Sequence, residues 1–154
     1  MSKKKYFLFL FLSVSVLYVI FRPVYVLEIS FNNHSVLIPL ASTLVLSVQY
    51  THSVSLTEVV DVYRINKTGI YAVEERWKDS MAGQPLNGEI KNGYFVKRMG
   101  KNLGTEWRYW FIGENEFEIV VDDRTVFVQP DEDGTLNFQI KQIPNYMLIA
   151  TSLR

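Results

Sequence analysis

The stretch of this sequence best equipped for chemistry is Tyr50-Thr51-His52-Ser53-Val54, which Glu58 follows four residues later. Histidine titrates near neutral pH, so an imidazole beside a carboxylate can act as a general base or hold a polar ligand. Alternation places His52 at the end of an apolar stripe, where a polar ring needs a hydrogen-bonding partner. The alternative is a structural histidine that a carboxylate or a backbone carbonyl satisfies. If the next strand folds back as a hairpin, the candidate partners are Glu58, Tyr63 and Ser80.

The residues around His52 do not support a serine hydrolase. The sequence contains no Gly-x-Ser-x-Gly motif, and Ser53 is adjacent to His52, so their side chains would point to opposite faces of a strand. Ser80 is a conceivable nucleophile, but only its position in a loop supports it. The acidic run Asp131-Glu132-Asp133-Gly134 lacks the further ligands and the distal glutamate of a calcium loop. We therefore expect no catalytic residue.

Composition excludes several classes of site. The chain has no cysteine, which rules out disulfides, thiolate metal sites and thiol nucleophiles. Its two histidines, His34 and His52, cannot form a three-histidine metal site. We expect neither a metal ion nor a cofactor. The 16 basic and 16 acidic residues balance, so bulk charge gives no reason to expect nucleic acid as a partner.

The N-terminus has the pattern of a membrane anchor. Lysines at positions 3–5 precede an apolar run at residues 6–21, and Arg22-Pro23 ends it. A membrane-spanning helix needs about 17–25 residues, so this run is at the short limit. The small residues that signal cleavage requires are missing at its end, so we expect an uncleaved, single-pass anchor at residues 1–23; secretion after signal cleavage is the alternative. The lysines would stay cytoplasmic, and the acidic remainder of the chain would be extracytoplasmic at the cell membrane.

Residues 24–154 have the pattern of one all-β domain. Short apolar or alternating runs divided by turn residues predict about ten short antiparallel strands, arranged as a small barrel or a two-sheet sandwich. Five of the eight glycines fall in Ser80–Gly104, which predicts a long loop there. Asp122-Asp123 and the acidic run at 131–134 are predicted hairpin turns. The predicted strands are Val24–Phe31, Ser35–Leu40, Thr43–Val54, Leu56–Ile65, Ile70–Lys78, Tyr94–Met99, Thr105–Ile112, Phe117–Val121, Thr125–Gln129, Leu136–Ile143 and Met147–Thr151.

Two segments, residues 49–63 and the loop at residues 80–85, together resemble the domain-of-unknown-function family numbered 1850. The family pattern is a strand that ends Tyr-x-His-Ser-Val, then an acidic residue, an aromatic residue, and a later Ser-x-Gly-Ala-Gly-x-Pro loop. Met81-Ala82 stands where that loop usually has Gly-Ala. The resemblance implies a small exported or membrane-anchored β protein, commonly encoded beside tripartite TAXI-type TRAP transporters, with no established activity. The matching residues are His52, Ser53, Val54, Glu58, Tyr63, Ser80, Gly83 and Pro85.

Three functional hypotheses follow, in this order. The first is a non-enzymatic accessory domain that contacts a transporter membrane subunit or a solute-binding protein, held to the membrane by residues 6–21. The second is a module that binds a small polar ligand. The third is an enzyme that uses His52 as a general base oriented by Glu58. For the second, the predicted polar cluster comprises His52, Ser53, Glu58, Tyr63, Ser80 and Gly83.

Overall fold

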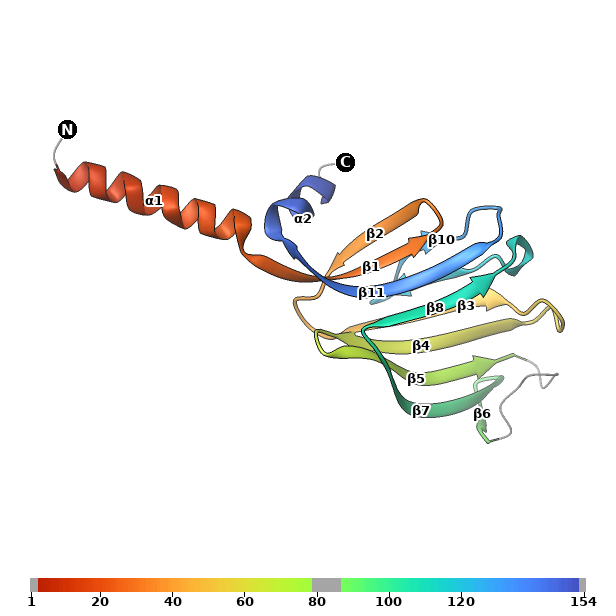
Figure 1. Ribbon diagram of the computed structural model, residues 1–154. Coiled ribbons are helices and arrows are strands. Elements are labelled where there is room, and N and C mark those ends of the chain that lie inside the picture. Colours follow the sequence, from red (N-terminus) through yellow and green to blue (C-terminus); the bar gives the residue numbers. More distant parts are fainter. Residues whose placement is uncertain (1–2, 79–86, 153–154) are drawn as a thin grey trace.

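The computed structural model describes residues 3–78 and 87–152 (Figure 1). A long N-terminal helix leads into a β-sandwich, and a short helix follows the last strand. The elements are α1 (Lys3–Phe21), β1 (Pro23–Phe31), β2 (His34–Pro39), β3 (Leu44–Thr51), β4 (Glu58–Asn66), β5 (Gly69–Trp77), β6 (Glu89–Lys91), β7 (Tyr94–Gly104), β8 (Glu106–Phe111), the 3₁₀ turn η1 (Gly113–Asn115), β9 (Glu118–Val121), β10 (Arg124–Val128), β11 (Gly134–Pro144) and α2 (Asn145–Ser152).

The strands form two open antiparallel sheets rather than a closed barrel. The smaller sheet has the order β2-β1-β11-β8, and the larger has the order β10-β9-β3-β4-β5-β7-β6. The all-β prediction is confirmed, and the sandwich alternative is the one that the chain adopts. We call the face of each sheet that is turned toward the other its inner face.

Alternation along the strands builds the core. In β3, Leu44, Leu46 and Val48 are buried, while the residues between them face outward. The rings of the two sheets meet around Phe117, whose centroid lies 4.6 Å from that of Phe111. These inward residues make one continuous apolar core between the sheets.

Two of the turns depend on a left-handed backbone. Asp122 and Asp123 have positive φ values of 46° and 65°. A two-residue hairpin turn that matches the right-handed twist of its strands needs positive φ at both central residues. Asn92 and Gly93 have the same signature at the turn between β6 and β7, with φ of 52° and 80°. The predicted Asp122-Asp123 hairpin is thus confirmed, whereas the prediction of a hairpin at residues 131–134 is wrong, because this segment joins β10 of the larger sheet to β11 of the smaller one.

Several predicted elements were wrong. Residues 147–151 lie in α2 and not in a strand, because a short apolar run fits either structure and packing against α1 and β11 decides between them. The strand β6 was missed because it has three residues. The predicted strand Tyr94–Met99 is confirmed, but β7 continues to Gly104, into residues that were predicted to be loop, and pairs with β5 despite its glycines. The strand β3 ends at Thr51, so the alternation does not extend to His52.

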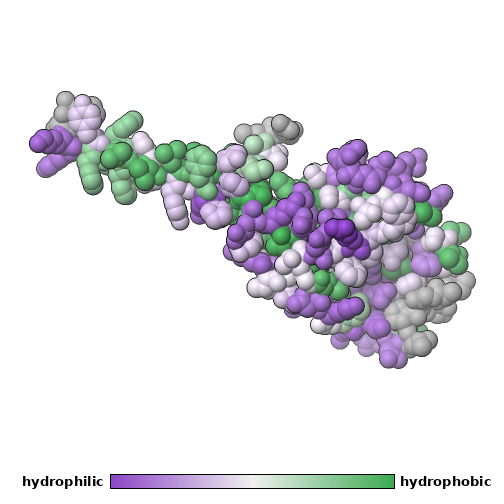
Figure 2. All heavy atoms as spheres, in the orientation of Figure 1, coloured by the Kyte–Doolittle hydropathy of each residue, from purple (hydrophilic) through white to green (hydrophobic). Residues whose placement is uncertain are grey.

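The helix α1 stands clear of the sandwich. None of its residues is buried, and it is long and apolar enough to cross a membrane or to serve as a signal sequence. Figure 2 shows hydrophobic side chains along this helix, on the side of the molecule away from the mixed surface of the sandwich. One residue, Arg22, separates its end from β1.

Candidate functional site

His52 organises the turn that joins β3 to β4. Its Nδ1 accepts hydrogen bonds from the backbone N–H groups of Val54 and Ser55, at 3.4 and 3.3 Å, and lies 3.2 Å from the Ser55 hydroxyl. Its backbone N–H donates to the Thr57 carbonyl, which closes the turn. On the other side the imidazole packs against Trp77, with ring centroids 5.2 Å apart. We call residues 52–57 the tip loop.

The tip loop presents two apolar side chains to solvent. Val54 is 75% exposed and Leu56 is 76% exposed, and Leu56 holds an unusual positive φ of 55°. The loop lies at the end of the sandwich away from α1 (Figure 1). Since His52 accepts from the N–H group of Val54 itself, the histidine side chain fixes how this apolar tip is displayed.

Glu58 lies in a different environment from His52. Its Oε2 accepts a hydrogen bond from the Tyr94 hydroxyl at 2.9 Å and lies 3.8 Å from Lys78 Nζ. This bond raises the pKa of Tyr94. Register places Glu58 opposite Thr51, on the outer face of the larger sheet. Among the described residues, no hydrogen bond or ion pair joins Glu58 to His52.

The other predicted site residues are dispersed. Tyr63 is buried in the core, where its ring packs near Tyr109 and Phe138. Ser53 is exposed in the tip loop. The structure therefore brings His52 and Ser53 together in one loop and leaves Glu58 and Tyr63 on opposite faces of β4. Ser80, Gly83 and Pro85 lie outside the described residues.

A shallow pocket does adjoin Glu58. It measures about 630 Å³ and lies where β3, β4 and β9 meet the segment after β10. We call it the acidic pocket because four of its lining residues are carboxylates: Glu58, Glu116, Glu118 and Asp131. His52 is not part of its lining. Within residues 3–78 and 87–152, no three histidine, aspartate or glutamate side chains cluster closely enough to hold a metal ion.

The sequence reasoning missed a polar cluster between the two sheets. Asp61 sits on the inner face of β4, 8% exposed, and its Oδ2 accepts a hydrogen bond from the Tyr109 hydroxyl of β8 at 3.0 Å. Glu75 is its direct neighbour on β5 and accepts a hydrogen bond from Trp77 Nε1 at 2.9 Å. The cluster therefore links β4, β5 and β8 across the core.

Burial sets the protonation of this cluster. Desolvation, reinforced by the nearby charge of Glu75, raises the pKa of Asp61 to about 7. The same burial, with the charges of Asp61 and Glu75, raises the pKa of Tyr50 and Tyr63 well above the ordinary tyrosine range. The Trp107 indole approaches the Tyr63 hydroxyl and acts in the opposite direction, although its N–H lacks hydrogen-bond geometry. Asp61 is thus a buried carboxyl that changes charge near neutral pH.

The signal for Asp61 was present in the sequence. In Val59-Val60-Asp61-Val62 a carboxylate interrupts a run of β-branched residues, at an inward position of the alternation. A charged residue in that place needs a partner or a shifted pKa.

Comparison with known proteins gives one match. The model of a family described as Domain of unknown function (DUF1850) matches residues 46–128. The matched segment covers nearly all of the larger sheet together with β8, whereas α1, β1, β2, β11 and α2 lie outside it. No curated protein and no solved structure matches the chain.

Proposed function

We propose that this chain, which belongs to the DUF1850 family, is a membrane-anchored extracytoplasmic domain that acts by binding another protein and not by catalysis. The observation that carries the proposal is α1, a 19-residue apolar helix with no buried residue that connects directly to the sandwich. At 1.5 Å per residue its apolar run, residues 6–21, is about 24 Å long, which is the short limit for crossing the hydrocarbon layer of a bilayer. Lysines at positions 3–5 favour a cytoplasmic N-terminus.

The tip loop is the surface that we assign to the partner. Burial of the exposed aliphatic side chains of Val54 and Leu56 against a partner would be favourable. The hydrogen bonds of His52 preorganise the loop that displays them. The contact area is small, which suits a weak contact. Anchoring compensates, because a domain confined to the membrane meets a membrane partner at high effective concentration.

The partner that we propose is a subunit of a tripartite solute transporter, either its membrane subunit or its solute-binding protein. Both are at the membrane surface on the side where the sandwich would lie. The resemblance of the His52 and Ser80–Pro85 motifs to the family associated with such transporters supports this choice.

Co-purification from native membranes tests the proposal. The tagged full-length protein would be extracted in mild detergent, and the recovered proteins quantified by mass spectrometry. Val54→Ser combined with Leu56→Ser should abolish recovery of the transporter subunit. Ile90→Ser, which removes an apolar side chain that is 84% exposed on β6, is the matched control and should leave recovery intact. Recovery of the subunit that is equal in both variants, or absent from the unmodified protein, would refute the proposal.

The acidic pocket favours one second candidate, a module for a small ligand. Four carboxylates around about 630 Å³ would suit a cationic group such as an amine. Thermal unfolding in the presence of a panel of small amines tests it. A ligand that raises the melting temperature of the unmodified protein but not of Glu58→Gln would support the candidate. Equal shifts in both proteins would place the ligand elsewhere.

A further inference from the structure

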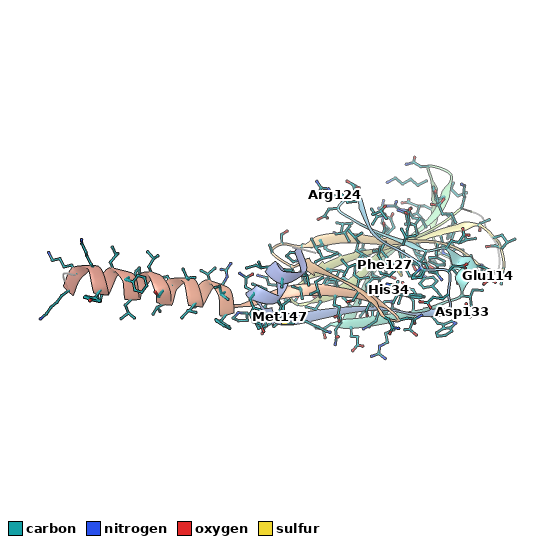
Figure 3. The ribbon with its side chains drawn as sticks, turned by 90° about the horizontal axis from the view of Figure 1, so that it is seen from above. His34, Glu114, Arg124, Phe127, Asp133 and Met147 are labelled. Carbon is teal, nitrogen blue, oxygen red and sulfur yellow. The ribbon has the colours of Figure 1, made fainter. Side chains whose placement is uncertain are left out.

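The helix α2 begins against the end of α1. The backbone N–H of Asn145 donates to the Arg22 carbonyl, and its Nδ2 donates to the Val19 carbonyl, both at 3.1 Å. The Tyr146 ring meets the Phe21 ring edge to face, with centroids 5.7 Å apart. The chain thus returns, after the whole sandwich, to the last turn of α1. In Figure 3 Met147 lies beside this junction, whereas Glu114 and Asp133 lie at the far end of the sandwich.

The helix α2 is uncharged, and the side chains of its middle, residues 146–150, are mostly apolar. From Asn145 to Ser152 the helix has no acidic or basic residue. One side, through Leu148, faces β2 across a groove of about 580 Å³ that Leu37 and Pro39 also line. The opposite side exposes Tyr146 and Met147, at 46% and 42%. Ala150, one turn after Tyr146, is exposed beside them.

Aromatic residues and one basic residue, Arg22, lie where α1 and α2 meet. Tyr18 and Phe21, in the last turn of α1, are exposed; Phe21 contacts Tyr146, and Arg22 follows it in the chain. At the opposite end of α1, Tyr6 follows the three lysines. Tyrosine is enriched at both membrane–water interfaces, and a basic side chain near the end of a membrane-spanning helix extends into the headgroup layer. The junction therefore has the composition of the outer boundary of the anchor.

We propose that α2 lies in the headgroup layer of the bilayer that α1 enters, with Tyr146, Met147 and Ala150 in contact with lipid. This inference rests on the proposed anchoring by α1. A helix bonded to the last turn of a membrane-spanning helix is held at the depth where that helix emerges. Burial of uncharged, apolar side chains at that depth is favourable, and the exposed side of α2 consists of such side chains. Two contacts with the membrane, instead of one, would then fix the tilt of the sandwich and the direction of its tip loop.

The test exploits the absence of native cysteine. Single variants Met147→Cys and Ala150→Cys, in the full-length protein, would carry an environment-sensitive fluorophore and be reconstituted in phosphatidylcholine–phosphatidylglycerol vesicles. Quenching would be measured with lipids that carry a nitroxide at the headgroup or on the acyl chain. Val14→Cys in α1 reports the anchor itself, and Ile90→Cys on β6 reports a site remote from the membrane.

Each outcome decides the inference. We expect headgroup nitroxides to quench labels at 147 and 150 at least about two-fold more than the label at 90, and acyl-chain nitroxides to quench the label at 14. Quenching at 14 with values at 147 and 150 equal to those at 90 would overturn the placement of α2 and leave the anchor standing. A label at 14 that lipid does not quench would overturn the anchor and this inference with it.

Discussion

Asp61 and Glu75 are direct neighbours across β4 and β5, with both side chains turned toward the smaller sheet. Like charges opposite each other in a sheet destabilise it, and burial adds to that cost for Asp61. The Tyr109 hydroxyl donates a hydrogen bond to Asp61 at 3.0 Å and so ties this pair to β8. The charge state of a core residue is therefore coupled to how firmly the two sheets hold together.

The first prediction concerns the pH dependence of stability. The pKa of Asp61 is about 7 in the folded protein against an ordinary value of 3.8, so the folded state binds the proton more tightly. Its contribution to stability is fully present below pH 3.8 and is lost as the pH rises through about 7. The free energy of unfolding of Asp61→Asn, relative to that of the unmodified protein, should therefore increase with pH, by up to about 4 kcal/mol between pH 4 and pH 8.

Chemical unfolding of the full-length protein in detergent, followed across this pH range, gives the difference directly. Subtracting the two free energies of unfolding removes the pH dependence that comes from the carboxylates which the two proteins share. Glu114→Gln, at an exposed position, is the control and should show no such trend. A difference for Asp61→Asn that does not change with pH would show that Asp61 is already ionised in the folded protein.

The second prediction concerns the bond between the sheets. Tyr109→Phe removes the donor to Asp61 and leaves a buried carboxyl less satisfied, which should lower the free energy of unfolding by about 1–3 kcal/mol. It should also raise the pKa of Asp61 further, because the ionised form loses a hydrogen bond. Tyr71→Phe is the matched control. In the described structure the Tyr71 hydroxyl bonds only to the exposed Thr68, so removing this hydroxyl should change the free energy of unfolding by about 0.5 kcal/mol or less.

The third prediction separates a structural His52 from a catalytic or ligand-binding one. His52→Ala leaves the N–H groups of Val54 and Ser55 without their acceptor and should cost about 1 kcal/mol. His52→Asn supplies a side-chain oxygen at the same place, as Asn66 does for the Thr68 N–H in the next turn, at 2.8 Å. Asparagine should thus restore both stability and partner recovery. Loss of function in His52→Asn with stability retained would instead show that the imidazole itself is required.

The fourth prediction concerns the core. Phe117 has no exposed surface and contacts the rings of Phe31 and Phe111. Phe117→Ala should lower the free energy of unfolding by about 3–5 kcal/mol, through lost burial and the cavity left behind. Trp110→Ala, at an exposed aromatic on the outer face of β8, should change it by about 0.5 kcal/mol or less. Comparable losses in the two variants would mean that Trp110 is covered by something in the protein as it exists.

The fifth prediction concerns the anchor. Leu12→Arg places a charge in the middle of α1, at a cost of about 2.5–3.5 kcal/mol for insertion into a bilayer. The fraction of protein that resists alkaline carbonate extraction should fall, while Leu12→Val should leave it unchanged. Intact-mass measurement of the membrane fraction should find the lysines at positions 3–5 still present. Their absence would show that the segment is cleaved as a signal.

The positions of most strands could be predicted because their residues alternate in a short, locally readable pattern. The helix α2 could not, since contacts with Val19, Arg22 and the strands beside it select the helix, and the sequence around residues 145–152 carries no record of them. For His52 the pattern predicted the need for a partner but not its kind. The partners are backbone N–H groups of its own loop, and these depend on where β3 ends. Asp61 was predictable from its inward register, but the partner Tyr109 comes from the other sheet.

The placement of β1 has a mechanical consequence. This strand continues directly from α1 and lies between two partners, with nine register pairs to β11 and six to β2. If a partner holds the tip loop while the membrane holds α1, tension runs along β1 and not across it. Hydrogen bonds between antiparallel strands lie perpendicular to the strands, so such a load shears them all together and cannot open them one at a time. The sandwich would then serve as a stiff link that passes force between the bilayer and whatever binds its far end.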